Sequence, residues 1–344
     1  MSMTNKERLL AAASGEKVDR PPCICPGGMM NMVFVDAMDA CGCYWPEAHT
    51  DPEKMANLAM ALGDGQGFEN YGVPFDMTVE AEAMGAVVYI GDKLTEPHVV
   101  ESPLTDITQW KTLPHFDFSK GRLKTTPDAI RIIKEKGDDY PIIGNLTGPF
   151  SVADTMIDMA ILLKEIRRHP DDVHGLMRHI AGELSAFGKE MVKAGADLLC
   201  LSEPSGTGEI LGLRWFREYS LQYINMALDD IEGVRKIVHI CGNMAPVYEA
   251  LPDLHCDVFS FESKIGVNAI KPYLEGKVIM GNVSTHAIGT APPERVERLS
   301  NNAIKNGVDI LAPACGIPST TPMENVRAMV MAAKGVSRSR GYNY

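Results

Sequence analysis

Three apolar runs in the sequence each end in side chains that bind metal ions. His239 and Cys241 end the first run, Glu262 ends the second and Cys315 ends the third. Residues two apart in a strand point to the same face, so His239 and Cys241 are directed at one point. One imidazole nitrogen, two sulfurs and a carboxylate suit tetrahedral zinc with one position that exchanges for a substrate. We therefore predict a zinc site at these four residues.

A structural explanation exists for each of these residues taken alone. Buried cysteine is common in protein cores, and a lone histidine is often held there by hydrogen bonds. The convergence of three strand ends, each followed by glycine or a turn signal, favours a metal site. A closed, purely structural zinc site is the alternative from another functional class. Such sites usually contain only Cys and His, so Glu262 argues against it.

The composition is typical of a globular protein with a large core. Of 344 residues, 45% are hydrophobic and 23% are charged, and the net charge is −12. This acidic balance argues against nucleic acid or an anionic membrane as a partner. No uncharged apolar run approaches the roughly 20 residues that span a bilayer. Eight cysteines are too few for a disulfide scaffold, and with no visible signal segment they predict a cytoplasmic location.

Strand-like and helical runs alternate along the chain. Strand-like runs lie near residues 23, 72, 142, 198, 238, 258, 279 and 310. Eight strands alternating with helices predict a (β/α)8 TIM barrel, with an open doubly wound sheet as the alternative. We expect a single domain over 1–344, a helical extension at 4–14, a peripheral excursion from 79 to about 118 after the second strand, and a loose tail at 337–344.

Further helices are expected between the strands. Such helical connections make the strands parallel, so that their carboxyl ends lie at the same end of the barrel. Their predicted ranges are 31–38, a helix starting at 52, 126–136, 151–166, 170–194, 213–230, 244–251, 267–274, 292–306 and 322–335. In a barrel the carboxyl ends of the strands converge on one mouth. Asn145, Glu203 and Asn282 end other strands and would line it. We take Glu262, Asn145 and Asn282 as candidate catalytic residues.

The stretches around these residues also carry a resemblance. They are 239–243, 261–266, 281–284, 311–318 and 321–326, with 45–50 and 80–85 nearer the N-terminus. Together they resemble the methylcobamide:coenzyme M methyltransferases of the uroporphyrinogen decarboxylase superfamily. The resemblance implies that His239, Cys241 and Cys315 are zinc ligands and that Glu262 is a fourth ligand that a thiol replaces. The order His, Cys, Glu, Cys is also similar to the zinc site of cobalamin-independent methionine synthase.

The resemblance implies methyl transfer from a methyl-Co(III) corrinoid to a zinc-activated thiol such as coenzyme M, as in methanogenesis and other one-carbon metabolism. Zinc deprotonates a coordinated thiol, and the thiolate is the nucleophile. Two cysteine ligands favour thiol alkylation over hydrolysis. The segment 253–258 resembles a corrinoid-binding DxHxxG signature but has Val258 in place of the glycine. A separate corrinoid protein is therefore expected to carry the methyl group.

Two alternatives lie within the same superfamily. One is a methyltransferase that uses another acceptor or that loads methyl groups onto a corrinoid. The other is a porphyrinogen decarboxylase, a class that needs arginines in the first strand loop to hold substrate carboxylates. The corresponding stretch, Cys23 to Met30, contains no arginine, which disfavours decarboxylation.

Overall fold

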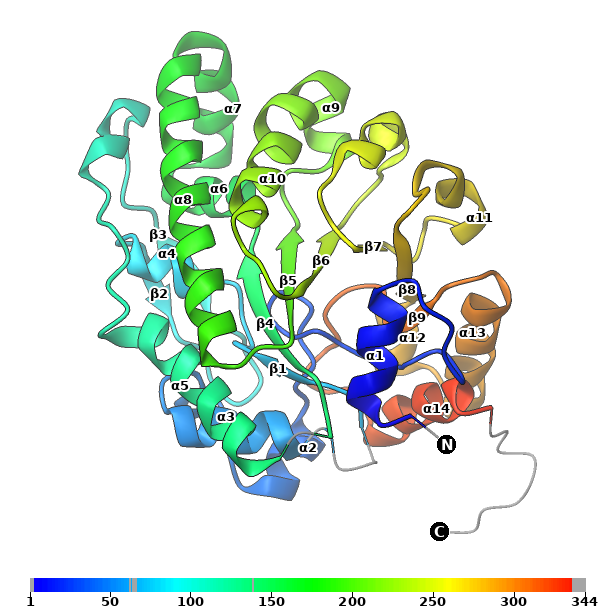
Figure 1. Cartoon of the computed structure of the whole chain (residues 1–344). Helices are drawn as coiled ribbons and strands as arrows, with labels where there is room; N and C mark the ends of the chain where they lie inside the picture. The colour runs from blue at the N-terminus through cyan, green and yellow to red at the C-terminus, as the bar shows by residue number, and fades with distance from the viewer. Residues whose placement is uncertain (1–2, 62, 64–66, 138, 336–344) are drawn as a thin grey trace.

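The strand-like runs of the sequence form parallel strands that curl into a barrel (Figure 1). The structure, a computed structural model, describes residues 3–61, 63, 67–137 and 139–335. The tail at 337–344, predicted to be loose, lies outside the described residues. Within them, seven strands form one sheet in the order β1 (Tyr71–Val73), β4 (Ile142–Thr147), β5 (Leu198–Glu203), β6 (Arg235–Ile240), β7 (Val258–Phe261), β8 (Val278–Val283) and β9 (Ile310–Pro313).

The central strands of this sheet are buried on both faces. Every residue of β4 and β5 is buried, because helices or barrel interior cover both sides of a parallel sheet. Parallel pairing places Ser202 of β5 beside His239 of β6, and His239 beside Ser260 of β7. The prediction of a (β/α)8 TIM barrel is confirmed as to fold class, with one change at the first strand.

The first predicted strand, near residue 23, is reduced to a single bridge. Cys23 pairs in parallel with Leu311 of β9, and its carbonyl accepts a hydrogen bond of 2.8 Å from the amide of Glu69, just before β1. The segment therefore occupies the gap between β9 and β1. Pro22 and Pro26 flank it and have no N–H to donate, which prevents a regular ladder.

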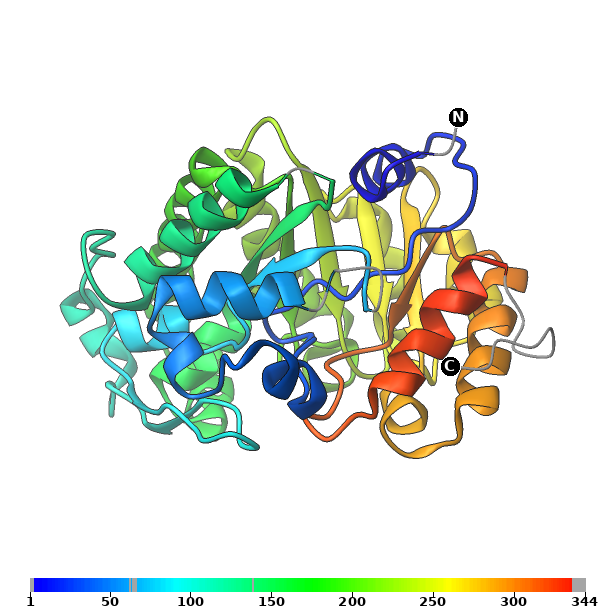
Figure 2. The same cartoon turned by 90° about the horizontal axis from the view of Figure 1, so that it is seen from below.

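Helices surround the strands, and short helical segments also occur within the connections at the strand ends (Figure 2). The helices are α1 (Asn5–Ala13), α2 (Val35–Cys41), α3 (Pro52–Ala61), α4 (Val79–Ala83), α5 (Gly121–Lys136), α6 (Pro149–Met156), α7 (Met159–Arg168), α8 (Pro170–Ala194), α9 (Gly208–Trp215), α10 (Gln222–Asp229), α11 (Val267–Ile270), α12 (Thr285–Thr290), α13 (Pro293–Lys305) and α14 (Met323–Ala333). Short 3-10 turns are η1 (Glu47–His49), η2 (Ile107–Thr112), η4 (Ala245–Asp253) and η5 (Lys271–Tyr273), and η3 (Phe216–Leu221) is a π-helix.

Helix α8 spans 25 residues and packs along β4 and β5. Pro170 occupies its first turn, where a missing N–H costs nothing, and Gly195 ends it with a left-handed φ of 117°. Leu176, Ile180, Leu184 and the other buried positions recur at helical spacing. The predicted range, 170–194, is confirmed.

Helix α1 is the expected N-terminal extension. Thr4 and Glu7 form a capping box at its start. Lys6 forms an ion pair of 2.9 Å with Asp197, which precedes β5, so α1 lies near the N-terminal ends of the strands (Figure 1). In the described ranges, no helix is both long and apolar enough to cross a bilayer.

Several predicted helices have different bounds. The range 151–166 holds two helices, because Ile157 is extended and Asp158 caps α7 through the amides of Ala160 and Ile161. The helix predicted at 126–136 begins at Gly121 and contains Pro127. The helix predicted at 213–230 is three elements, α9, η3 and α10. The helix predicted at 31–38 begins at Val35, and α12 had no predicted counterpart. Tertiary packing overrides local propensity at these boundaries.

The expected excursion after the second strand is also present. It contains α4, an antiparallel pair of β2 (Val87–Tyr89) and β3 (His98–Glu101), and η2. It lies on the outside of the barrel beside α8 (Figure 1).

Candidate metal centre

His239 is positioned by the middle of the sheet. It lies in β6 between β5 and β7 and is fully buried. Its Nδ1 atom is 3.0 Å from the hydroxyl oxygen of Ser260, and its Nε2 atom is 3.1 Å from Cys241 Sγ. When Nδ1 carries the proton and donates it to Ser260, the Nε2 lone pair faces the cysteine. This is the tautomer that binds a metal.

Cys241 follows β6 directly and stands at a turn made by Gly242. Gly242 has a φ of 72°, and a Cβ there would collide with the Glu209 carboxylate. Glycine is therefore required for the chain to leave the strand at this point. The turn holds Cys241 on the same side as His239, as the spacing of two residues predicted.

Cys315 reaches the same place from the end of β9. Its sulfur is 3.6 Å from that of Cys241. Gly316 is the next residue, and a Cβ there would come within 2.8 Å of the backbone of Met29 and Asn31. The segment after Cys315 thus packs against the N-terminal loop without a side chain between them. The ligand atoms of His239, Cys241 and Cys315 all lie within 4.8 Å of one another.

The sulfurs of Cys241 and Cys315 lie within hydrogen-bonding distance, and this contact shifts their two pKa values in opposite directions. The hydrogen bond from Cys241, together with His239, lowers the pKa of Cys315 against the opposing effect of burial. The hydrogen bond to Cys315 and burial raise the pKa of Cys241, and the charge of Glu262 adds to this increase. Electron-rich sulfurs that compete for a proton form a donor set that a divalent cation satisfies better. The residues present therefore fit a thiophilic metal such as zinc.

Glu262 lies after β7 at the same end of the barrel but is not part of the three-residue cluster. Its Oε1 atom accepts hydrogen bonds from the amide and the hydroxyl of Ser263, at 2.8 and 2.7 Å. Its charge is nevertheless felt at Cys241, whose pKa it raises. Its role as fourth ligand stays a prediction.

The two candidate asparagines hold loops at the mouth. Asn282 donates through Nδ2 to the carbonyls of Glu262 and Ile265, at 3.1 and 2.8 Å, and so fixes the loop that carries Glu262. Asn145 donates to the carbonyls of Pro26 and Val73, at 2.9 and 3.1 Å. These contacts position loops, and the catalytic role of both asparagines stays a prediction.

Glu203, also expected at the mouth, organises the loop after β5. It is fully buried and accepts hydrogen bonds from the amides of Phe150 and Gly206, both at 2.9 Å, and from the Ser151 hydroxyl. Burial raises its pKa. Ser260 was not predicted from the sequence. The signal was available, because Ser260 precedes Glu262 by two residues and so shares its face of the strand.

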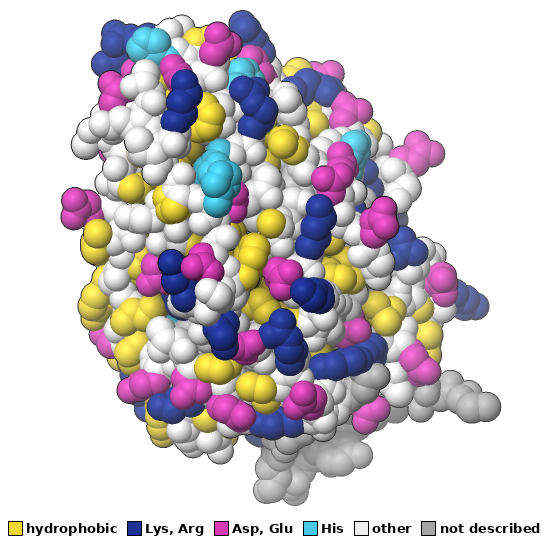
Figure 3. Space-filling model, turned by 60° about the vertical axis from the view of Figure 1, so that its left-hand side comes forward, with side chains coloured by type: hydrophobic (Ala, Val, Ile, Leu, Met, Phe, Trp, Pro, Cys, Tyr) yellow, Lys and Arg dark blue, Asp and Glu magenta, His cyan; other side chains and the backbone are white. Residues whose placement is uncertain are grey.

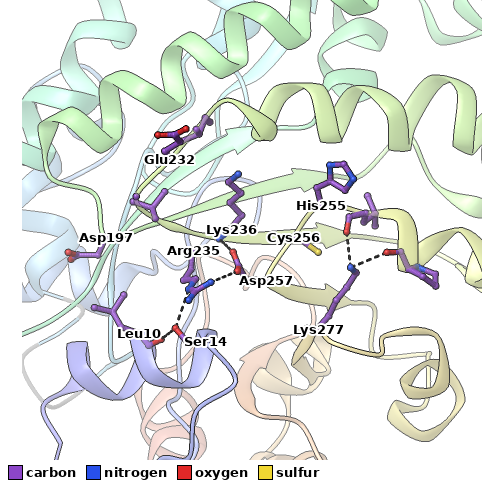
Figure 4. Close-up of a pocket in the computed structure, with 15 residues that line it drawn as sticks. Leu10, Ser14, Asp197, Glu232, Arg235, Lys236, His255, Cys256, Asp257 and Lys277 are labelled. Atoms are coloured by element: carbon purple, nitrogen blue, oxygen red, sulfur yellow. Dashed lines mark hydrogen bonds and ion pairs between the residues drawn. The ribbon is translucent and has the colours of Figure 1, made fainter.

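A large pocket lies where β5 to β8 begin (Figure 4), whereas the metal cluster lies where β6 and β9 end. Its volume is about 880 Å³, and it is lined by residues at the starts of strands. Two of the charged side chains that line it have polar partners within the pocket. Arg235 pairs with Asp257 at 2.8 Å, and Lys277 donates to the carbonyl of Leu254 at 2.7 Å. In TIM barrels the N-terminal face contributes to stability, and the active site lies at the other face, so we assign these residues a stabilising role.

Comparison with known proteins identifies the family. The family model described as Uroporphyrinogen decarboxylase (URO-D) matches residues 4–336. The methylcobamide:CoM methyltransferase MtbA of Methanosarcina acetivorans is 33% identical over 96% of this chain and 98% of its own length. The methylcobamide:CoM methyltransferase MtaA of Methanosarcina barkeri is 32% identical over 96% of this chain and 97% of its own length.

A solved structure is similar over nearly the whole chain. It is described as a methyltransferase from Methanosarcina mazei and has 31% sequence identity, a TM-score of 0.91 and coverage of 97% of this chain and 99% of that chain. The chain therefore belongs to the methylcobamide:CoM methyltransferase family of the uroporphyrinogen decarboxylase superfamily. The resemblance inferred from the sequence is confirmed.

Proposed function

We propose that this protein transfers a methyl group from a methyl-Co(III) corrinoid to a small thiol such as coenzyme M. The observation that carries the proposal is the convergence of His239, Cys241 and Cys315 at the carboxyl ends of β6 and β9. In TIM barrels this face holds the active site. The names of the relatives point in the same direction.

We propose that His239, Cys241 and Cys315 hold zinc, with Glu262 as the exchangeable fourth ligand. Bound there, zinc supplies the positive charge that keeps a substrate thiol deprotonated at neutral pH. Ser260 orients His239, and the two cysteines keep the site electron-rich. Ser263 binds Oε1 of Glu262, and among the residues that the structure describes no hydrogen bond is made to Oε2, the oxygen that we propose approaches the metal.

The reaction balances without an added oxidant or reductant. The thiolate sulfur forms a bond to the methyl carbon, and the cobalt–carbon bond breaks with both electrons left on cobalt as Co(I). The thiol proton passes to solvent. The reverse reaction loads a methyl group onto Co(I), so the direction in the cell depends on the partners.

We propose that the corrinoid arrives on a separate protein. The segment 253–258, which resembles a corrinoid-binding signature, has Val258 in place of glycine, and residues 245–253 form the 3-10 turn η4. All eight cysteines are free thiols, which fits a reducing compartment such as the cytoplasm.

The proposal is tested with methylcobalamin as the methyl donor and a panel of thiols that includes coenzyme M. We expect thiol-dependent loss of the methyl-cobalt absorbance. Cys315→Ser should remove this activity and about one equivalent of zinc relative to wild type. Cys256→Ser is the matched control, because Cys256 is half-buried and lines the pocket where β5 to β8 begin. Transfer that survives without zinc would overturn the mechanism.

A porphyrinogen decarboxylase is the second candidate, because the family model carries that name. The stretch Cys23 to Met30 holds no arginine to bind substrate carboxylates. Incubation with a porphyrinogen substrate should therefore release no carbon dioxide.

A further inference from the structure

A second cluster of metal-binding side chains lies on the outer face of the barrel. His179 and Glu183 stand four residues apart on α8, and His115 faces them from the segment that links the excursion to α5. One ligand atom from each residue lies within 4.8 Å of the other two. The cluster shares no residue with the candidate metal centre at the mouth.

The segment 110–118, which we call the strap, packs along one face of α8. Trp110 covers Gly175, where a Cβ would collide with its ring, and its Nε1 atom donates to Asp172 at 3.1 Å. Phe116 and Phe118 both pack against Phe187, with ring centroids 6.3 Å away. Positions 175, 179, 183 and 187 succeed one another at a spacing of four, so they lie on one face of the helix.

The strap holds His115 in place over this face of α8. The amide of Phe116 donates to Glu183 Oε2 at 2.7 Å, and His115 Nδ1 lies 2.5 Å from Glu183 Oε1. His179 Nε2 donates to the carbonyl of Pro114 at 3.1 Å. The rings of His115 and His179 have centroids 5.0 Å apart. The hydrogen bond from the Phe116 amide to Glu183 and the packing of Phe116 and Phe118 on Phe187 hold the strap in place without a metal, so little ordering is needed to bind one.

The donor set selects the class of metal. Two imidazole nitrogens and one carboxylate oxygen suit zinc and neighbouring divalent transition metals, whereas calcium and magnesium prefer oxygen ligands alone. Three protein ligands leave one position of a tetrahedral ion free. Water can reach this position, because the His115 side chain is 84% exposed. Histidine side chains are visible at the surface on this side of the molecule (Figure 3).

We propose that His115, His179 and Glu183 form a second site for a divalent transition metal, which fastens the strap to α8. The cation takes the place of the proton held between His115 and Glu183, and His179 exchanges its contact with Pro114 for the metal. The strap leads directly into α5, so the ion links the excursion, α5 and α8.

The test is a zinc titration of metal-free protein in competition with a chromophoric chelator. We expect about two equivalents bound by wild type and about one by His179→Ala or His115→Ala. His169→Ala is the matched control and should bind two. His169 makes the same contact with Glu165, four residues earlier and at 2.5 Å, but no third ligand joins that pair in the described residues.

Cobalt(II) distinguishes the two sites, because thiolate ligands give intense charge-transfer bands and nitrogen and oxygen ligands do not. In Cys241→Ser/Cys315→Ser the bands should vanish while one equivalent of metal still binds and raises the melting temperature. If that variant does not fold, the numbers of zinc equivalents bound by wild type and by His179→Ala still test the second site. Equal stoichiometry in wild type and His179→Ala overturns the second site, whatever happens at the thiolates.

Discussion

His239 and Ser260 stand side by side on neighbouring strands, with the histidine Nδ1 atom 3.0 Å from the serine hydroxyl. Both residues are fully buried, so no water competes for the contact. A histidine that binds metal through one nitrogen usually donates a hydrogen bond from the other. We therefore expect Ser260 to orient the His239 ring so that its Nε2 atom faces Cys241.

Ser260→Ala is expected to weaken zinc binding about 10- to 100-fold, because the His239 ring loses the partner that fixes its tautomer and orientation. The measurement is a zinc competition titration. Ser300→Ala is the control, since Ser300 is equally buried but its hydroxyl donates to Val296 within α13. Unchanged zinc affinity in Ser260→Ala would mean that packing alone orients His239.

Glu262→Gln tests the proposed role of Glu262 as the exchangeable fourth ligand. The amide keeps the size of the side chain and can still accept from Ser263, but it is a poorer metal ligand than a carboxylate. We expect zinc to bind more weakly, by about tenfold or more, and methyl transfer to persist at a reduced rate. Glu275→Gln, at an exposed position, should change neither. Complete loss of transfer with zinc still bound would instead assign Glu262 a role in proton transfer.

Asn282→Ala removes two of the hydrogen bonds that hold the loop at 262–265, where the amide of Ile265 also donates to the carbonyl of Glu262. The loop that carries Glu262 is then less well fixed, so we expect weaker zinc binding and a reduced kcat, similar to those of Glu262→Gln, while zinc stays bound to the other three residues. The control is Asn325→Ala, whose amide donates to the carbonyls of Ile288 and Ala291 in a comparable way. Similar losses of stability with unequal losses of kcat would support the positioning role of Asn282.

The sequence predicts the barrel and the cluster of His239, Cys241 and Cys315 for the same reason. Buried parallel strands are apolar runs in the sequence, and the residues directly after each run lie at the barrel mouth. Spacing alone placed His239 and Cys241 on one face. The spacing of residues does not predict side-chain rotamers. The rotamer of Glu262 places its carboxylate against Ser263 in this structure.

Contacts between distant segments account for the other differences. The sequence predicts a strand near residue 23, but not that its pairing is limited to one bridge from Cys23 to Leu311, far along the chain. The start of α5 at Gly121 likewise depends on Arg122, which binds Asp76 in the interior. Neither contact produces a periodic pattern in the local sequence, so neither could be predicted from it.

The Asp76–Arg122 pair makes a prediction about pH. Both side chains are buried, and Arg122 Nη1 lies 3.0 Å from the Asp76 carboxylate. Burial alone would raise the pKa of Asp76, but Arg122 and His49 lower it below its usual range. The unfolded chain therefore binds the proton more readily than the folded one. The pair stabilises the fold fully above an unfolded pKa of about 3.9 and loses this effect as the pH falls further.

Asp76→Asn should cost about 3–5 kcal/mol at pH 7, because it leaves Arg122 buried without its main counter-charge. The cost, measured by urea unfolding, should shrink between pH 5 and pH 3 as Asp76 becomes protonated in the unfolded wild type. Asp128→Asn is the control, since Asp128 pairs with Lys124 and Arg131 on the partly exposed surface of α5, where such pairs contribute about 1 kcal/mol or less. A cost for Asp76→Asn that stays constant over this pH range would show that the carboxylate acts through shape and hydrogen bonding, and not through its charge.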